Sequence, residues 1–214
     1  MSSTWLMMPF HRRARRAGGW CRVAAVMVVA LVPMLATSCG SQERGPGTTP
    51  QATSPAPTTN QAPAGKTARG TGYSVVVPGG WKDATAQAAS GTPVRADLLL
   101  AGPTTDAFAS NVNVLRVPVQ GADLAAIVSA GRDRIETDLK DGRLVGEAQA
   151  VDVGGTPGLS YEFTHSSNRK PLHAKQVVAV RDGNAYIITL TAHKESFSSD
   201  VPTFNQILSS WSWN

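Results

Sequence analysis

Short turns separate the apolar runs in the C-terminal half of this chain, and they restrict its fold more than any other feature. Gly154-Gly155-Thr156-Pro157-Gly158 separates two such runs, and Asp182-Gly183-Asn184 separates the next two. Strands joined by turns this short must pair antiparallel, because a parallel connection needs a dozen or more residues. The four runs therefore predict an antiparallel meander with strands at 144–153, 159–165, 172–181 and 185–193.

Further strands and two helices are expected around this meander. Residues 72–77 form a β-branched run, 96–101 an apolar run, and 111–117 alternate polar and apolar residues, as in a strand with one solvated face. Residues 122–140 have the clearest helical period, and 202–211 have a shorter one. The predicted fold class is α+β, an antiparallel β-sheet flanked by helices.

The apolar stripe of the helix at 122–140 is thin in its middle. Ala130 and Gly131 lie there, between larger aliphatic residues on either side. Small residues at this position permit either a close contact between helix and sheet or a gap that holds a ligand. The stripe consists of Leu124, Ile127, Val128, Ile135 and Leu139.

The N-terminal residues 1–38 have the organisation of a secretory signal. Five arginines precede an uncharged apolar stretch from Val23 to Leu35, which is too short for a permanent transmembrane helix. Removing residues 1–38 leaves fifteen basic and fifteen acidic residues, so the mature chain is formally neutral. A neutral chain without a basic stripe is not expected to bind nucleic acid.

Cys39 directly follows the small residues Ala36-Thr37-Ser38, and this arrangement resembles the lipobox of bacterial lipoproteins. The resemblance implies that Cys39 carries the lipid and anchors the protein on the extracytoplasmic side of the cell membrane. Ala36 departs from the pattern, because a leucine usually stands there and Leu35 is one position further out. The alternative is an ordinary secreted protein that is cleaved nearby.

Composition divides the mature chain into a tether and one domain. Residues 39–70 comprise the lipidated cysteine and a segment rich in Ser, Thr and Pro, which cannot bury enough apolar surface to fold and is predicted to be disordered. Residues 71–214 are 144 residues long, a normal size for a single globular domain. This domain contains no cysteine, so its stability must come from a packed core.

Five segments of the domain resemble the LpqN/LpqT-type lipoproteins of mycobacteria and other actinobacteria. The matching segments include the strand-Pro-Trp opening and a Phe followed by Asn-Val-Asn-Val. They are residues 73–81, 108–114, 155–163, 174–191 and 207–211. More distantly, the chain is similar to the fold shared by photosystem PsbP proteins, Mog1 and DcrB. The resemblance implies a sheet sandwiched by helices and an accessory or adaptor role in the envelope, with protein partners rather than catalysis.

The sequence contains no convincing catalytic motif. Gly158-Leu159-Ser160-Tyr161-Glu162 approaches a nucleophile elbow, but Glu162 replaces the second glycine and Ser160 falls within a predicted strand. No glycine cluster is followed by Lys-Ser or Lys-Thr, so no phosphate-binding loop is predicted. We therefore expect no catalytic residue.

Three histidines are candidates for a metal site. If Gly183 centres its loop, His173 faces His193 across the hairpin on a solvated face, and His165 ends the preceding strand at the same end of the sheet. Imidazoles in this arrangement bind Zn²⁺ or Cu²⁺. However, no carboxylate or thiol joins them at ligand spacing, and polar histidines at strand ends are the simpler interpretation. We therefore predict no metal and no cofactor.

Trp81, Trp211 and Trp213 allow an aromatic ligand wall, although core packing explains Trp81 and Trp211 more simply. The sequence thus favours a lipid-anchored, non-catalytic envelope protein that binds a protein partner or an apolar ligand between helix and sheet. A metal-binding accessory domain and, with less support, a hydrolase are the alternatives.

Overall fold

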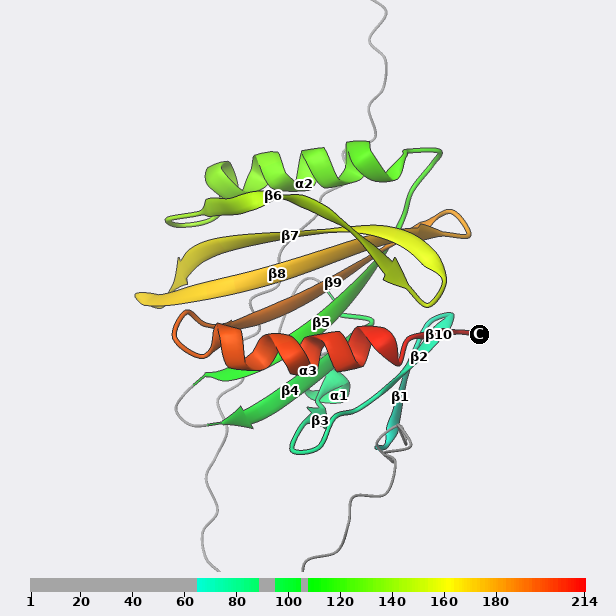
Figure 1. The fold of residues 1–214 in the computed structure, drawn as a ribbon, viewed down its shortest axis with the longest axis horizontal. Helices are drawn as coiled ribbons and strands as arrows, with labels where there is room; N and C mark the ends of the chain where they lie inside the picture. Colours follow the sequence, from blue (N-terminus) through cyan, green and yellow to red (C-terminus); the bar gives the residue numbers. More distant parts are fainter. Residues whose placement is uncertain (1–64, 89–94, 105–107) are drawn as a thin grey trace, which may run out of the picture.

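The computed structural model describes residues 65–88, 95–104 and 108–214 (Figure 1). Cys39, the predicted signal peptide and most of the predicted tether lie outside these ranges. Within them, no helix combines the length and the apolar character needed to cross a membrane.

The described ranges hold ten strands and three helices. In chain order they are β1 (Thr67–Gly70), β2 (Tyr73–Val76), β3 (Lys82–Asp83), α1 (Thr85–Ala88), β4 (Leu98–Thr104), β5 (Ala109–Pro118), α2 (Leu124–Asp138), β6 (Arg143–Val153), β7 (Thr156–Ser167), β8 (Lys170–Arg181), β9 (Asn184–His193), α3 (Phe197–Ser209) and β10 (Ser212–Trp213).

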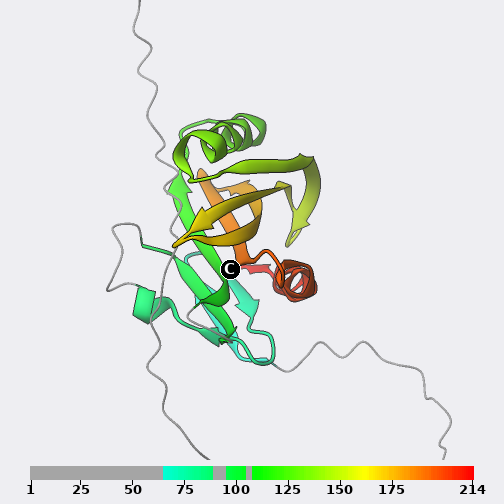
Figure 2. The same ribbon diagram turned by 90° about the vertical axis from the view of Figure 1, so that its left-hand side faces the viewer.

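Seven strands form one sheet in the order β3-β4-β5-β9-β8-β7-β6, and a small sheet has the order β1-β2-β10. Every strand pair is antiparallel, and β6 to β9 form the predicted meander. Helix α2 contacts β6, β7 and β8, whereas α3 contacts β9 and β2 from the other face of the large sheet (Figure 2). The structure confirms the predicted α+β class.

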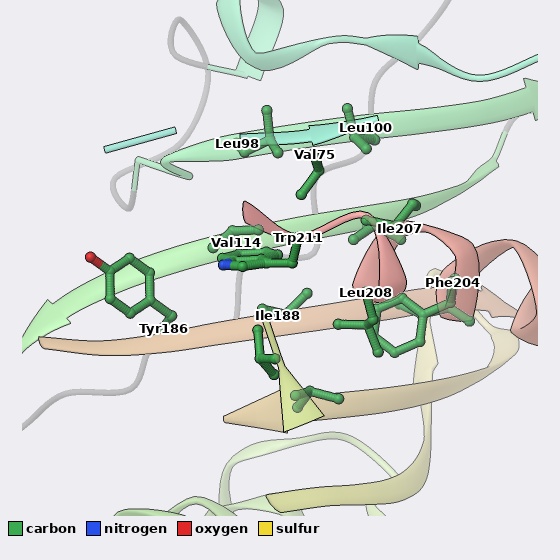
Figure 3. Close-up of a cluster of buried hydrophobic side chains, with 14 of the residues drawn as sticks. Val75, Leu98, Leu100, Val114, Tyr186, Ile188, Phe204, Ile207, Leu208 and Trp211 are labelled. Carbon is green, nitrogen blue, oxygen red and sulfur yellow. The ribbon is translucent and has the colours of Figure 1, made fainter. Parts of the chain in front are cut away.

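The main core lies between α3 and the central strands. Phe204 and Ile207 of α3 are almost fully buried, and they approach Ile188, Val114 and Leu98 of the sheet (Figure 3). Burying each large aliphatic side chain contributes about 1.5–3 kcal/mol. This contact fixes one face of the sheet against α3 and leaves the opposite face for α2.

Helix α3 begins at Phe197, five residues before the start predicted at Pro202. Proline is tolerated in the first turn of a helix, and Pro202 lies inside the longer helix that the structure shows. Phe197 and Phe204 are seven residues apart, so they lie on the same face of the helix, and both are buried in the main core. Core packing by Phe197 therefore extends the helix beyond the proline.

The small sheet begins within the segment predicted to be a tether. Strand β1 starts at Thr67 and pairs with β2, with Ala68 opposite Val75. Ala68 is buried, so the folded part begins before the boundary predicted at residue 71. The composition of this segment does not predict a strand, because β1 is stabilised by pairing with β2 rather than by its own side chains.

Helix α2 has the predicted apolar stripe and a side-chain cap. Asp123 precedes the helix and accepts a hydrogen bond from the amide of Ala126 at 2.7 Å. Val128 and Ile135 are buried in a second core cluster against β7, β8 and β9. The Asp123 cap explains why the helix starts two residues later than predicted.

Ala130 and Gly131 occupy different environments. Ala130 is exposed and does not belong to the stripe, contrary to the expectation from its position. Gly131 faces Tyr161 of β7 so closely that an added Cβ would lie 2.7 Å from the phenolic oxygen. Glycine at this position therefore permits a close contact between helix and sheet.

Candidate functional site

A row of uncharged polar side chains is buried on the sheet face that carries α2. We call the set Asn111, Asn113, Gln176, Thr189 and Thr191 the polar row; each is between 4% and 7% exposed. The alternation of Asn111 and Asn113 with valines predicted a solvated face for β5, and this prediction is wrong. Both faces of β5 are buried at these positions, so the asparagines require hydrogen-bond partners from another source.

The polar row follows the pairing register of three neighbouring strands. Thr189 of β9 lies opposite Gln176 of β8 on one side and opposite Asn113 of β5 on the other. Thr191, two residues further along β9, lies opposite Asn111. Side chains two residues apart on a strand share a face, so these five point to the same side of the sheet.

Part of the polar row forms a buried hydrogen-bond chain. The hydroxyl of Tyr161 donates to Oε1 of Gln176, and Nε2 of Gln176 donates to Oγ1 of Thr189 at 2.9 Å. Burial raises the pKa of Tyr161 to about 12, although Arg132 opposes this shift. The phenol therefore stays protonated at neutral pH and acts as a donor.

Arg132 of α2 lies beside this chain. Its guanidinium carbon is 6.0 Å from the centre of the Tyr161 ring, and Nη2 is 3.3 Å from Oε2 of Glu147. Nη2 also donates to the carbonyl of Gly146 at 3.4 Å. Arg132 thus connects α2 to β6 and covers the Tyr161 end of the chain.

The other end of the polar row lies on β5 and β9. The amide nitrogen of Asn111 donates to the carbonyl of Ala109 at 3.2 Å. In the described part of the chain, the polar row contributes none of the buried side-chain atoms that lack a hydrogen-bond partner. Its burial is therefore compatible with the rule that buried polar groups are hydrogen-bonded or reached by water.

The polar row contains no ionisable group that suits it for acid–base chemistry. Among the described residues, the strands β5 and β9 place no Asp, Glu, Lys or Arg on this face. On this face of β9, among the described residues, the titratable side chain is that of His193, whose ring is 4.9 Å from that of Phe108. The available chemistry is neutral hydrogen bonding by amides and hydroxyls.

Ser160 lies within β7, as predicted, and not on a strand-to-helix turn. It is buried, and its hydroxyl donates to the carbonyl of Gln149 at 3.4 Å. Its position opposite Val177 places it on the face of α3, away from the polar row. The sheet therefore separates Ser160 from the polar row.

The predicted pairing of His173 with His193 is wrong by one residue. His173 lies opposite Ala192, and His193 lies opposite Leu172, so the two imidazoles point to opposite faces. The reason is the turn, in which Asp182 and Gly183 both have positive φ and form a two-residue loop rather than a loop centred on Gly183. No group of three potential metal ligands occurs in the described part of the chain.

The immediate surroundings of His173 also differ from the prediction, because a carboxylate does adjoin it. Its Nε2 is 3.3 Å from Oε2 of Glu162, whose Oε1 is 3.3 Å from Nζ of Lys175. The imidazole stacks on the ring of Phe197 with centroids 3.6 Å apart. Burial lowers the pKa of His173, while Glu162 opposes this shift. His173 therefore packs as a mainly neutral ring beneath α3.

His165, the third candidate, lies on β7 opposite Leu172, on the same face as His193. It is buried next to Phe163, at a centroid distance of 5.9 Å. Burial lowers its pKa. The structure places His165 in the core beneath α2.

Two of the three tryptophans of the predicted ligand wall come together. Trp211 stacks on Tyr73 with centroids 4.1 Å apart, and Trp213 lies 5.3 Å from Trp211. The indole nitrogen of Trp213 donates to the carbonyl of Val153 at 2.9 Å. Trp81 packs elsewhere on the main core. These aromatic rings pack on one another and on the core.

The fold is an antiparallel sheet with α2 on one face and α3 on the other. Residues 74–210 match the family model of DcrB, and the chain belongs to this family. No curated protein matches the chain in sequence.

Solved structures share this fold at low sequence identity. LpqN, described as involved in cell envelope biogenesis of Mycobacterium tuberculosis, has a TM-score of 0.52 and 15% identity, over 70% of this chain and 84% of LpqN. The cyanobacterial PsbP protein CyanoP of Synechocystis sp. PCC 6803 has a TM-score of 0.51 and 16% identity, over 67% of this chain and 87% of CyanoP. The Ran-binding protein Mog1p of Saccharomyces cerevisiae has a TM-score of 0.45 and 12% identity, over 66% and 90% of the two chains.

Sequence reasoning missed most of the polar row. The face of Thr189 and Thr191 that His193 shares is predicted to be solvated, and no motif in the sequence points to Gln176. The available signal was the pairing of two alternating polar patterns, Asn-Val-Asn in β5 and Thr-Leu-Thr in β9. Alternation alone does not reveal that the polar face is covered.

Proposed function

We propose that this protein is a non-catalytic accessory lipoprotein of the bacterial cell envelope, whose folded domain binds a ligand or a protein partner. Membership of the DcrB family and the involvement of LpqN in cell envelope biogenesis support the envelope assignment. The signal organisation and Cys39 support a lipid anchor on the extracytoplasmic side of the membrane. The resemblance to LpqN/LpqT-type lipoproteins belongs to the same proposal.

The buried polar row on the α2 face carries the binding proposal. Its side chains are between 4% and 7% exposed, and burying amides and hydroxyls costs free energy that apolar side chains at these positions would not cost. Proteins retain such a cost mainly where the group serves a function. Without a charged acid or base beside them, these groups suit recognition rather than a chemical step.

We propose that the binding region lies away from the contact between α2 and the sheet. Gly131 lies against Tyr161 at that contact, which leaves no space for a side chain and none for a ligand. The polar row extends instead over β5 and β9, next to the strands that α2 contacts. We therefore place ligand binding at the polar row.

Native mass spectrometry tests the binding proposal. The mature lipoprotein, extracted from its host membrane, should retain an additional mass that the Asn113→Leu variant lacks. Asn113→Leu preserves side-chain size and removes only the amide, so the comparison is matched. A wild type that retains no additional mass, or a variant that retains the same one, would contradict binding at the polar row.

Cell fractionation tests the anchor. Cys39→Ala should shift the protein from the membrane to the soluble fraction and abolish acyl labelling. Retention in the membrane with no labelling of the wild type would show that another feature holds the protein there. The anchor and the ligand site are independent, so either can fail without the other.

A further inference from the structure

Arginine and aromatic side chains from four strands meet at the end of the sheet next to the β8–β9 turn. Tyr186 of β9 lies directly opposite Arg116 of β5, and its ring centre is 4.8 Å from that of Trp213 in β10. The guanidinium carbon of Arg181, in β8, is 5.0 Å from the centre of the Trp213 ring. We call Arg116, Arg181, Tyr186 and Trp213 the arginine–aromatic patch.

The arginine–aromatic patch lies on the face of the sheet that carries α3. Directly opposite residues of paired strands point to the same side, so Arg116 shares the side of Tyr186. Tyr186 belongs to the main core, and Trp213 packs against that core. The polar row lies on the other face, so the two are separate surfaces.

The patch is accessible from solvent. Arg116 and Arg181 are exposed, and Trp213 is half-buried. The neighbouring β6–β7 turn adds no side chain, because it consists of two glycines. Gly154 approaches Trp213 so closely that an added Cβ would lie 3.1 Å from the indole nitrogen, and Gly155 has open space around it. The indole ring is therefore flanked by two guanidinium groups and not covered by the turn.

Trp213 is fixed to the sheet. Its indole nitrogen donates to the carbonyl of Val153 at 2.9 Å, and its ring centre is 5.3 Å from that of Trp211. Side chains that are already ordered lose little entropy on binding, and Trp, Tyr and Arg dominate the binding energy of protein interfaces. A tryptophan that inserts into a membrane would have to leave the sheet and break this hydrogen bond. The patch therefore suits a protein partner better than a lipid surface.

The charge that is available for binding at the patch is positive. Arg116 makes no ion pair with the described part of the chain. Arg181 has an acidic neighbour in Asp182, 3.5 Å from its Nε, but the Asp182 side chain is 85% exposed and such a pair contributes little. Guanidinium groups pair best with carboxylates, which they bind through two parallel hydrogen bonds. The complementary partner is therefore acidic.

We infer that the arginine–aromatic patch binds an acidic segment of a protein partner. Carboxylates of that segment pair with Arg116 and Arg181, and an apolar side chain between them packs on Trp213. This inference goes beyond the ligand binding proposed at the polar row and does not depend on it, because the two surfaces lie on opposite faces of the sheet.

Fluorescence anisotropy with the full mature chain tests the inference. The probes are two labelled peptides, Gly-Asp-Asp-Phe-Asp-Asp-Gly and its uncharged counterpart Gly-Asn-Asn-Phe-Asn-Asn-Gly. The acidic peptide should bind about tenfold more tightly, because amides cannot form the charge-assisted pairs with the two arginines. Equal affinity for the two peptides, or no binding of the acidic one, would overturn the inference.

Single substitutions locate the binding. Arg116→Gln and Arg181→Gln should each weaken binding of the acidic peptide about tenfold without changing the Tm, since both side chains are exposed. Lys140→Gln, at an exposed position just after α2, removes the same charge and should leave the affinity unchanged. Asp182→Asn should tighten binding, because it removes the carboxylate that competes for Arg181, and asparagine tolerates the φ of 48° at this position. Equal weakening by Lys140→Gln and Arg116→Gln would show unspecific charge attraction and overturn the inference.

Vesicle sedimentation distinguishes a protein segment from a lipid headgroup. The Cys39→Ala variant of the mature chain should sediment no more with phosphatidylglycerol vesicles than with phosphatidylcholine vesicles. Binding to phosphatidylglycerol that Arg116→Gln abolishes, together with no binding of the acidic peptide, would assign the patch to lipid and overturn the inference. In native mass spectrometry, Arg116→Gln should still retain the mass that Asn113→Leu lacks, so the two binding proposals fail separately.

Discussion

Replacing Gly131 by alanine tests how closely α2 approaches the sheet. The added methyl group would lie 2.7 Å from the hydroxyl oxygen of Tyr161, closer than side-chain carbons tolerate. That hydroxyl donates to the buried Oε1 of Gln176, so it cannot move without breaking this hydrogen bond. The next atom of the ring, Cζ, would be at an ordinary contact distance of 3.8 Å.

Two opposing effects determine the size of the change. Alanine is favoured over glycine in a helix interior by about 1 kcal/mol. Displacing the Tyr161 hydroxyl loses a hydrogen bond of about 0.5–1.5 kcal/mol and leaves the oxygen of Gln176 unpaired, at about 1–3 kcal/mol. We expect Gly131→Ala to lower the free energy of unfolding by about 1–3 kcal/mol.

Urea denaturation of four proteins measures this balance as a double-mutant cycle. In the Tyr161→Phe background the clashing oxygen is absent, so Gly131→Ala should stabilise the protein by about 1 kcal/mol through helix propensity alone. The sign of the substitution thus reverses between the two backgrounds. A stabilising Gly131→Ala in the wild type would refute the close contact between α2 and β7.

Three further predictions concern the core, the buried histidine and nucleic acid. Ile135→Ala removes a side chain that is 3% exposed and should lower the free energy of unfolding by about 2–5 kcal/mol. Ala130→Leu, on the exposed face of α2, should change it by less than about 0.5 kcal/mol. Urea denaturation of the two variants compares these effects. Burial lowers the pKa of His165 in the folded state, so the unfolded chain binds the proton more readily. The free energy of unfolding should therefore fall as the pH drops below about 6.5. A urea midpoint that is equal at pH 7.5 and 5.5 would argue against this. The mature chain should not bind DNA at physiological salt, and micromolar affinity with a steep salt dependence in a fluorescence titration would contradict its formal neutrality.

Local sequence patterns predicted the main elements because their physical causes are local. Short turns forced the strands of the meander to pair antiparallel, and β6 to β9 do so. The helical period placed Val128 and Ile135 on the buried face of α2. Alternation along residues 159–165 predicts that Tyr161 and Phe163 share one face of the strand, and in β7 both lie in the core cluster beneath α2.

Register and burial depended on contacts that the local pattern does not contain. The two-residue turn at Asp182-Gly183 shifted β8 by one position, and this shift placed His173 and His193 on opposite faces. Alternation in β5 showed that Asn111 and Asn113 share a face, but the tertiary structure decided that this face is buried.

The sequence by itself determined the fold class, the antiparallel meander, the stripe of α2 and the neutral charge of the mature chain, since each follows from neighbouring residues or from composition. Only the tertiary structure aligned Gln176 and Thr189 with Asn113 in one row and buried this row. That arrangement joins residues more than sixty positions apart, and it arises from the order and register of strands that no local pattern specifies.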